Sequence, residues 1–288
     1  MFVIIGYVVA LGCIFGAYII HGGNIQVIVK ALPTEMMAIA GGALGAFTVA
    51  NQPKVLKAVG GAIPKLLKGS KYTKARYMEL MALLYDILQK ARKEGLMAIE
   101  KDVETPHESP LFKKYATVGS DHHVVEFITD YLRMMVSGNL NPHEIESLMD
   151  SEIETHHHEA HAPAAAIARL AGALPAFGIV AAVLGVVNTM GSVGQPPAVL
   201  GAMIGSALVG TFLGILLAYG VFEPIGGLMD QKVEESSKEF QCVKTTLLAS
   251  MQGYAPQVAV EFGRKVLYST ERPTFIELES HVKGKKPA

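Results

Sequence analysis

The sequence predicts an all-α membrane protein with four transmembrane helices and a helical cytoplasmic domain. Half of its 288 residues are hydrophobic and only 18% are charged, a balance that soluble domains rarely show. Apolar runs cover residues 2–20, 36–50, 171–190 and 198–222, and each has about the length that a helix needs to cross a bilayer. The second run is the shortest and extends back to Leu32. Between and after these runs, apolar residues recur at helical spacing.

The runs divide the chain into four predicted parts. These are transmembrane helices 1 and 2 (1–50), a cytoplasmic helical domain (51–166), transmembrane helices 3 and 4 (167–224) and cytoplasmic C-terminal helices (225–288). The first run has no basic stretch before it and no small-residue cleavage pattern before His21, so we expect a retained helix and not a removed signal peptide. Lys and Arg follow the second and fourth runs, whereas the other two links hold only Lys30. The positive-inside rule therefore predicts that both termini and the central segment are cytoplasmic.

Several amphipathic helices are predicted in the cytoplasmic parts. They cover residues 75–91, 121–137, 231–251 and 257–267, with a further capped start at 269–273. Gly95 interrupts the first of these helices and Gly138 ends the second. Asn141 and Pro142 suit the N-cap and first residue of another helix. Pro224 is the one break expected between the fourth span and its polar continuation, and we interpret the apolar faces as packing between helices.

Composition argues against several functional classes. The net charge of −1 gives no support for nucleic-acid binding. Cys13 lies in a span and Cys242 in a cytoplasmic part, so we expect two free thiols and no disulfide. The sequence holds no glycine-rich phosphate loop between a strand and a helix, and no catalytic set stands out. We therefore expect neither enzyme activity nor a cofactor.

A dense histidine cluster, His156 to His161, precedes the third span. Four positions separate His157 from His161, which places both on one helix face, where histidines can bind zinc. The cluster lacks the His-Glu-x-x-His order of metalloproteases. A polar helix surface near lipid head groups is the alternative, so we assign no metal site and leave metal binding by this cluster open.

The third and fourth spans contain no ionisable side chain. Residues 171–222 include no Asp, Glu, Lys, Arg or His, although proton and ion relays normally need an ionisable group at depth. Glu35 is the one candidate, and we interpret it as an interfacial carboxylate at the outer end of the second span that reaches water. The chain alone is therefore unable to carry ions across. If it belongs to an ion-driven machine, another chain must supply the carboxylate.

Prolines, glycine pairs and a few hydroxyl groups mark the apolar spans. Pro175 and Pro224 lie near the cytoplasmic ends of their helices, where proline removes a backbone bond and favours a kink. For Pro175 a helix start is the alternative. Thr211 either lines a path or bonds to a helical carbonyl. Glycine pairs four residues apart, at 41 and 45, 201 and 205, and 210 and 214, allow helices to approach closely.

Five long motifs are recognisable along the chain. In chain order they are GYVVALGCIFGAY, SKYTKARYMELMALLYDIL, ALPAFGIVAAVLGVV, GTFLGILLAYGVFEP and GYAPQVAVEFGRKVLYSTERPTFIELE. They resemble the MotA-type stator subunit of the bacterial flagellar motor, in the MotA/TolQ/ExbB proton channel family, over nearly the whole chain. The resemblance implies an ion-driven motor of the bacterial inner membrane that serves motility. It also implies a pentameric ring around two helices of a MotB-type B subunit, which supplies the membrane aspartate and anchors to the cell wall.

The resemblance also implies roles for individual residues. Pro175 and Pro224 match the two family prolines where ion uptake on the partner becomes movement of the cytoplasmic part. Arg92 and Glu100 match two charges that bind opposite charges on the rotor protein FliG. Without the resemblance, both are ordinary solvated helix charges. Thr211 matches a hydroxyl position that faces the partner's aspartate.

One residue of the third span predicts the transported ion. Sodium-driven relatives tend to have a threonine two turns after the third-span proline, but Ala182 stands there and offers no oxygen ligand, so we expect protons rather than sodium.

An ExbB- or TolQ-type energiser of outer-membrane transport normally has three spans and a large loop after the first, whereas this loop follows the second. A membrane scaffold without ion flow is a third hypothesis. We expect a stator subunit that forms a proton channel with its B subunit and converts ion flow into torque.

Overall fold

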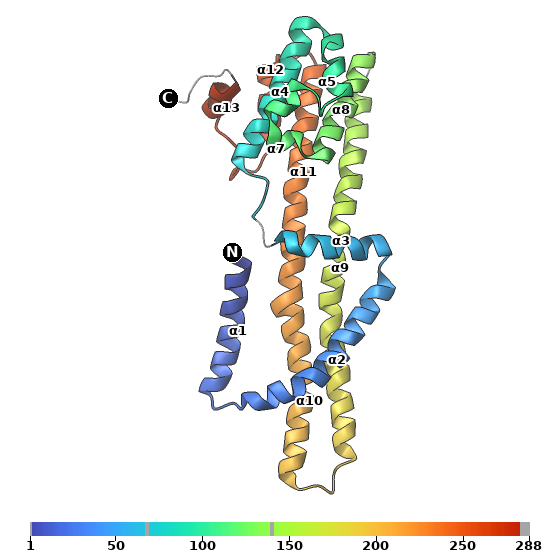
Figure 1. The fold of residues 1–288 in the computed structure, drawn as a ribbon, viewed down its shortest axis with the longest axis vertical. Helices are drawn as coiled ribbons and strands as arrows, with labels where there is room; N and C mark the ends of the chain where they lie inside the picture. The colour runs from blue at the N-terminus through green and yellow to red at the C-terminus, as the bar shows by residue number, and fades with distance from the viewer. Residues whose placement is uncertain (1, 67–68, 139–140, 283–288) are drawn as a thin grey trace. The chain divides into compact units, whose positions relative to one another are not determined.

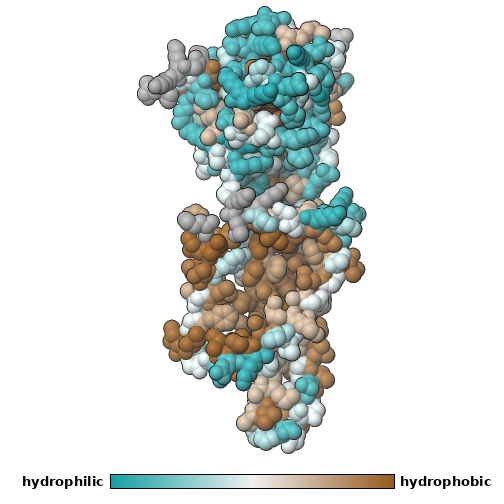
Figure 2. All heavy atoms as spheres, in the orientation of Figure 1, coloured by the Kyte–Doolittle hydropathy of each residue, from teal (hydrophilic) through white to brown (hydrophobic). Residues whose placement is uncertain are grey.

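The described chain is helical throughout and forms two compact units (Figure 1). The computed structural model describes residues 2–66, 69–138 and 141–282. The membrane unit comprises Met1–Gly69 and Glu159–Gln231, and the polar unit comprises Ser70–His158 and Lys232–Ala288. Four helices in the described part are long and apolar enough to cross a membrane, which confirms the predicted fold class. Figure 2 shows apolar side chains covering the face of the membrane unit.

The first two helices of the membrane unit are α1 (Phe2–Ile20) and α2 (Ile25–Ala50). No residue of α1 is buried within the chain, so its apolar surface is available to lipid or to other chains. Helix α2 begins well before the apolar run predicted from Leu32, because Asn24 caps it. The Asn24 side chain accepts a hydrogen bond from the amide of Gln26 at 3.0 Å. Pro33 therefore lies inside the helix and not at its start.

A short amphipathic helix, α3 (Pro53–Leu66), completes the N-terminal part of the membrane unit. Its apolar residues Val55, Val59 and Ala62 pack into the core of that unit. Lys54 and Lys57 are exposed on the helix. Figure 1 shows α3 running across the long helices of its unit instead of along them, the orientation of a helix that lies at a membrane surface.

The third span belongs to one 49-residue helix, α9 (Pro142–Met190), which runs through both units. As predicted, the helix begins at Pro142, and Asn141 Oδ1 accepts a hydrogen bond from the amide of His143 at 3.0 Å. Pro163 and Pro175 both lie inside it. The alternative that Pro175 starts a helix is therefore wrong, because the preceding turns are already helical. Each internal proline removes one backbone donor from the helix.

The fourth span is α10 (Pro197–Leu217), which continues through a π-helical turn into α11 (Glu223–Met251). The π turn, labelled η2, covers Ala218–Phe222 and directly precedes α11, whose second residue is Pro224. A π turn relieves the clash that a proline ring makes with the carbonyl four residues earlier in a regular α-helix. The predicted break at Pro224 is thus a change in helix type and not an interruption.

The polar unit contains the remaining helices around one hydrophobic core. They are α4 (Lys74–Glu94), the 3-10 turn η1 (Leu96–Ile99), α5 (Glu100–Glu104), α6 (Pro110–Lys114), α7 (Ala116–Gly119), α8 (His122–Ser137), α12 (Pro256–Lys265) and α13 (Phe275–Val282). Gly95 and Gly138 end α4 and α8 with positive φ, as the sequence predicts. Helix α13 starts at Phe275, later than the predicted 269–273. The described cysteines, Cys13 and Cys242, are free.

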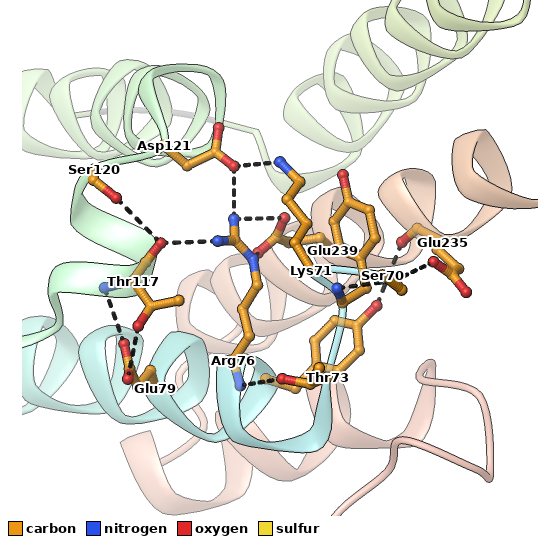
Figure 3. A network of polar contacts seen from close by, with 12 residues as sticks. Ser70, Lys71, Thr73, Arg76, Glu79, Thr117, Ser120, Asp121, Glu235 and Glu239 are labelled. Carbon is orange, nitrogen blue, oxygen red and sulfur yellow. Dashed lines mark hydrogen bonds and ion pairs between the residues drawn. The ribbon is translucent and has the colours of Figure 1, made fainter. Parts of the chain in front are cut away.

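A buried charge cluster connects three helices of the polar unit (Figure 3). Arg76 of α4 donates from Nε to Glu239 Oε1 of α11 at 2.7 Å and from Nη2 to Asp121 Oδ2 at 2.7 Å. Its Nη1 donates to the carbonyl of Thr117 at 2.8 Å. Lys71 Nζ also lies 2.6 Å from Asp121 Oδ2. The guanidinium thus has several acceptors arranged around it, as a buried charge requires.

Candidate functional site

The α9 and α10 helices approach each other closely at three glycines. A Cβ placed on Gly178 would lie 2.9 Å from the carbonyl oxygen of Gly210 and 3.0 Å from Cα of Gly214. A Cβ on Gly214 would lie 2.8 Å from the carbonyl oxygen of Leu174. The Gly210–Gly214 pair therefore makes the close helix contact that its spacing predicts. Gly41, Gly45 and Gly201, by contrast, meet no atom within 4 Å of an added Cβ in this chain.

Three of the predicted ion-path residues surround this glycine contact. Pro175 follows Leu174, whose carbonyl touches Gly214. The backbone nitrogen of Ala182 lies 3.3 Å from a Cβ placed on Gly210, and Thr211 is the next residue after Gly210. All three side chains are partly buried. The structure therefore brings Pro175, Ala182 and Thr211 to one stretch of the α9–α10 pair.

Pro224, the fourth predicted residue of the ion path, lies apart from this group, just after the π turn. It is exposed in the single chain. A side chain from α1 marks the same turn, because the Tyr7 hydroxyl donates a hydrogen bond to the carbonyl of Val221 at 3.0 Å. Sequence reasoning did not single out Tyr7. The signal available there was a phenol, one of two with Tyr18, in an otherwise apolar helix; a phenol seeks a hydrogen-bond acceptor when it is partly buried.

Glu35 is placed differently from the prediction. It lies inside α2, and its Oε2 atom is buried without a hydrogen-bond partner in the described part of the chain. A Cβ placed on Gly210 would overlap with this oxygen, so the carboxylate packs directly against the middle of the fourth apolar run. The expectation of an interfacial carboxylate that reaches water is therefore wrong for Oε2. The reason is that α2 begins at Ile25 and extends for 26 residues, which places Glu35 within the helix and not at its end.

The two predicted rotor-contact residues lie on either side of one short turn of the polar unit. Arg92 is in the last turn of α4, and Glu100 is the first residue of α5, directly after η1. Both are exposed. Arg92 beside the C-terminus of α4 and Glu100 at the N-terminus of α5 each suit the sign of the local helix dipole. The turn between them starts with Leu96 and Met97, which are exposed as well.

Two charges close to this turn have ion-pair partners, whereas Arg92 and Glu100 have none in the described part of the chain. Lys90 Nζ lies 2.7 Å from Asp102 Oδ2, and Arg133 Nη1 lies 2.7 Å from Asp130 Oδ1. No ion pair or side-chain hydrogen bond joins Arg92 or Glu100 to another residue among those that the structure describes. These two groups therefore keep their full capacity to pair with charges on another protein.

The histidine cluster does not form a metal site of its own in the described residues. His157 Nδ1 lies 3.0 Å from Ser237 Oγ, and His161 Nε2 lies 3.0 Å from Asp230 Oδ1. The one group of potential ligands that the described part brings within metal-binding distance is His122, His123 and Glu126 at the start of α8. All three are exposed, and the start of a helix disfavours a cation.

Comparisons with known proteins agree with this arrangement of helices. Residues 4–95 match the family described as "Motility protein A N-terminal", and residues 120–242 match the "MotA/TolQ/ExbB proton channel family". "Motility protein A" of Escherichia coli (strain K12) is 51% identical over 286 residues, which cover 99% of this chain and 96% of the relative.

Two solved structures share the fold. "Structure of C. jejuni MotAB" has a TM-score of 0.76 and 23% identity, with 94% of this chain and 97% of that chain covered. "Structure of the flagellar MotAB stator complex from Bacillus subtilis" has a TM-score of 0.71 and 24% identity, with 90% and 92% covered. The four candidate spans and the identity to the Escherichia coli relative lead to one assignment. The chain is a multi-pass membrane protein, not an enzyme, and it belongs to the motility protein A family of flagellar-motor stator subunits, within the MotA/TolQ/ExbB proton channel family.

Proposed function

We propose that the chain is the A subunit of a proton-driven stator in the bacterial inner membrane, with both termini in the cytoplasm. Five copies form a ring around two helices of a MotB-type B subunit, whose membrane aspartate takes up the proton. One observation carries this proposal: residues 171–222, which include the whole of α10 and its contact with α9, contain no ionisable side chain. A path beside such helices needs a carboxylate from another helix. Glu35 of α2 packs against Gly210, and we propose that the partner's aspartate, not Glu35, takes up the proton.

Movement of the ring follows from the charge state of the partner's aspartate. Protonation neutralises the aspartate and removes the cost of a charge among apolar helices, so the ring favours a new rotational position around the central pair. Pro175 and Pro224, each in or beside a long helix that continues into the polar unit, are the proposed coupling points. Arg92 and Glu100 carry the step to the rotor protein FliG. Salt-dependent rim contacts of this kind suit an interaction that forms and releases repeatedly.

Protons are the proposed ion because Ala182 has no oxygen ligand. Thr211 contributes the one hydroxyl group proposed to face the aspartate. A hard cation such as sodium needs several oxygen ligands, whereas a proton needs only hydrogen-bonded groups or water.

Proton flux into vesicles tests this function. We expect proton flux into vesicles that contain the chain together with a B subunit whose plug segment is removed. We expect no proton flux into vesicles that contain the chain alone. Flux from the chain alone would contradict the role of the partner's aspartate. Absence of flux from the complex, with both subunits shown to be present, would instead favour a scaffold.

A further inference from the structure

An exposed apolar turn lies between Arg92 and Glu100 in the polar unit. Leu96 is 41% exposed and Met97 is 64% exposed, whereas Ile99 at the end of the same turn is fully buried. The turn is thus anchored by one residue and presents two others to solvent. Apolar side chains that cluster beside charged groups on a surface are typical of protein interfaces.

A cavity of about 410 Å³ opens beside this turn. Leu96 lines one side of it, Leu88, Leu132 and Met135 contribute further apolar surface, and Tyr254 lines another side. Arg92 also lines the cavity, as does Ser250, so a cationic residue and a hydroxyl group border its apolar part. The volume exceeds what one aliphatic or aromatic side chain needs, and it lies within the range of sites that bind small ligands or anchor side chains.

The position of Arg92 restricts what fits this cavity. Its guanidinium has no ion-pair partner among the described residues, and a partner that covered it without supplying an acceptor would incur the cost of burying a charge. A suitable occupant therefore combines an apolar side chain with a carboxylate close to it. Residues three or four apart on one helix face present such a pair.

We propose that the cavity receives an apolar side chain from a helix of the rotor protein while a carboxylate on the same face of that helix pairs with Arg92. Glu100, across the exposed turn, pairs with a basic group further along the partner. This inference rests on the rotor contact described under Proposed function and adds an apolar anchor to it. The charges steer the encounter, and the anchor supplies most of the affinity.

Binding of purified rotor protein to the full-length chain, held with its B subunit in lipid nanodiscs, tests the anchor. Leu96→Gln removes apolar surface at an exposed position, and Ala91→Leu fills part of the cavity from its lining. We expect each to weaken binding about tenfold, equivalent to about 1.4 kcal/mol, at both low and high salt. Leu148→Gln is the matched control, because Leu148 is a similarly exposed leucine on α9 outside the cavity lining. It should bind as the wild type does.

Arg92→Gln separates this inference from the rotor contact itself. We expect it to weaken binding at low salt and to have little effect at high salt, where screening already suppresses the ion pair. Wild-type affinity in Leu96→Gln, together with weaker binding in Arg92→Gln, would overturn the anchor and leave the rotor contact intact. No binding by the wild type, or no effect of Arg92→Gln at low salt, would overturn the rotor contact and the anchor with it. Melting temperatures of all variants show whether Ala91→Leu still folds, and Leu96→Gln decides the question if it does not.

Discussion

Replacement of Arg76 by methionine tests the buried charge cluster that joins α4 to α11. The Arg76 side chain is 4% exposed and Glu239 is 1% exposed, so the change leaves a buried carboxylate without its main partner. Removal of one member of a buried ion pair costs about 3–5 kcal/mol. For a domain of this size the melting temperature falls by about 2–4 °C per kcal/mol, so we expect a decrease of roughly 10 °C. Thermal unfolding of the purified complex, followed by circular dichroism, measures it.

The loss of stability caused by Arg76→Met should also depend on pH. Burial raises the pKa of Glu239, although Arg76 opposes this effect through its hydrogen bonds and charge. Without Arg76, burial acts unopposed and the pKa rises further. A carboxyl whose folded-state pKa is raised keeps its stability at low pH and loses it as pH rises through that pKa. Arg76→Met should therefore be closer to the wild type at mildly acidic pH than at pH values above neutrality.

Two further variants control this experiment. Arg76→Met combined with Glu239→Leu replaces the pair with apolar groups and should recover most of the lost stability. Lys114→Met breaks an exposed pair with Asp86, in which the lysine side chain is 60% exposed, and should cost less than about 1 kcal/mol. The reasoning is refuted if Arg76→Met unfolds at the same temperature as Lys114→Met.

Three other changes have defined outcomes. Gly214→Ala should destabilise the complex by about 1–3 kcal/mol, because the added Cβ meets backbone atoms of α9. Gly227→Ala is the control and should not destabilise the complex, because its Cβ meets nothing within 4 Å. Melting temperatures compare the two variants. Tyr7→Phe removes the hydrogen bond to Val221 and should cost about 1 kcal/mol by the same measurement, and an unchanged melting temperature would count against this bond. Burial disfavours ionisation of Asp121, but Lys71 and Arg76 outweigh it and lower its pKa, so the polar unit should lose stability as pH falls below about 4. Asp121→Asn should reduce this dependence in a pH series of unfolding curves.

The spans and the amphipathic helices were predictable because they depend on local patterns. Apolar length identified the four spans, and glycines with positive φ marked the ends of α4 and α8. The continuity of α9 was not predictable, because Pro175 is compatible with a helix start as well as with an internal position. The structure distinguishes the two cases, because the turns before Pro175 are already helical.

Long-range contacts account for what sequence patterns missed. Arg76 and Glu239 are 163 positions apart, so no local pattern predicts that they pair. The burial of Glu35 Oε2 was missed because it depends on a contact between α2 and Gly210 of α10, which lie far apart in the sequence. The roles of Arg92 and Glu100 depend on another protein. Their own chain reveals only that both are exposed and that neither has an ion pair in the described part.

Swimming speed measured against sodium concentration and against a protonophore tests the central claim most directly. The chain is expressed in a strain that lacks its own A subunit, with the B subunit present. A proton-driven stator predicts that swimming is restored, that speed is independent of sodium and that the protonophore abolishes it. Speed that follows sodium and resists the protonophore would contradict the assignment of protons. Failure to restore swimming, with the complex present in the membrane, would contradict the function as a motor subunit.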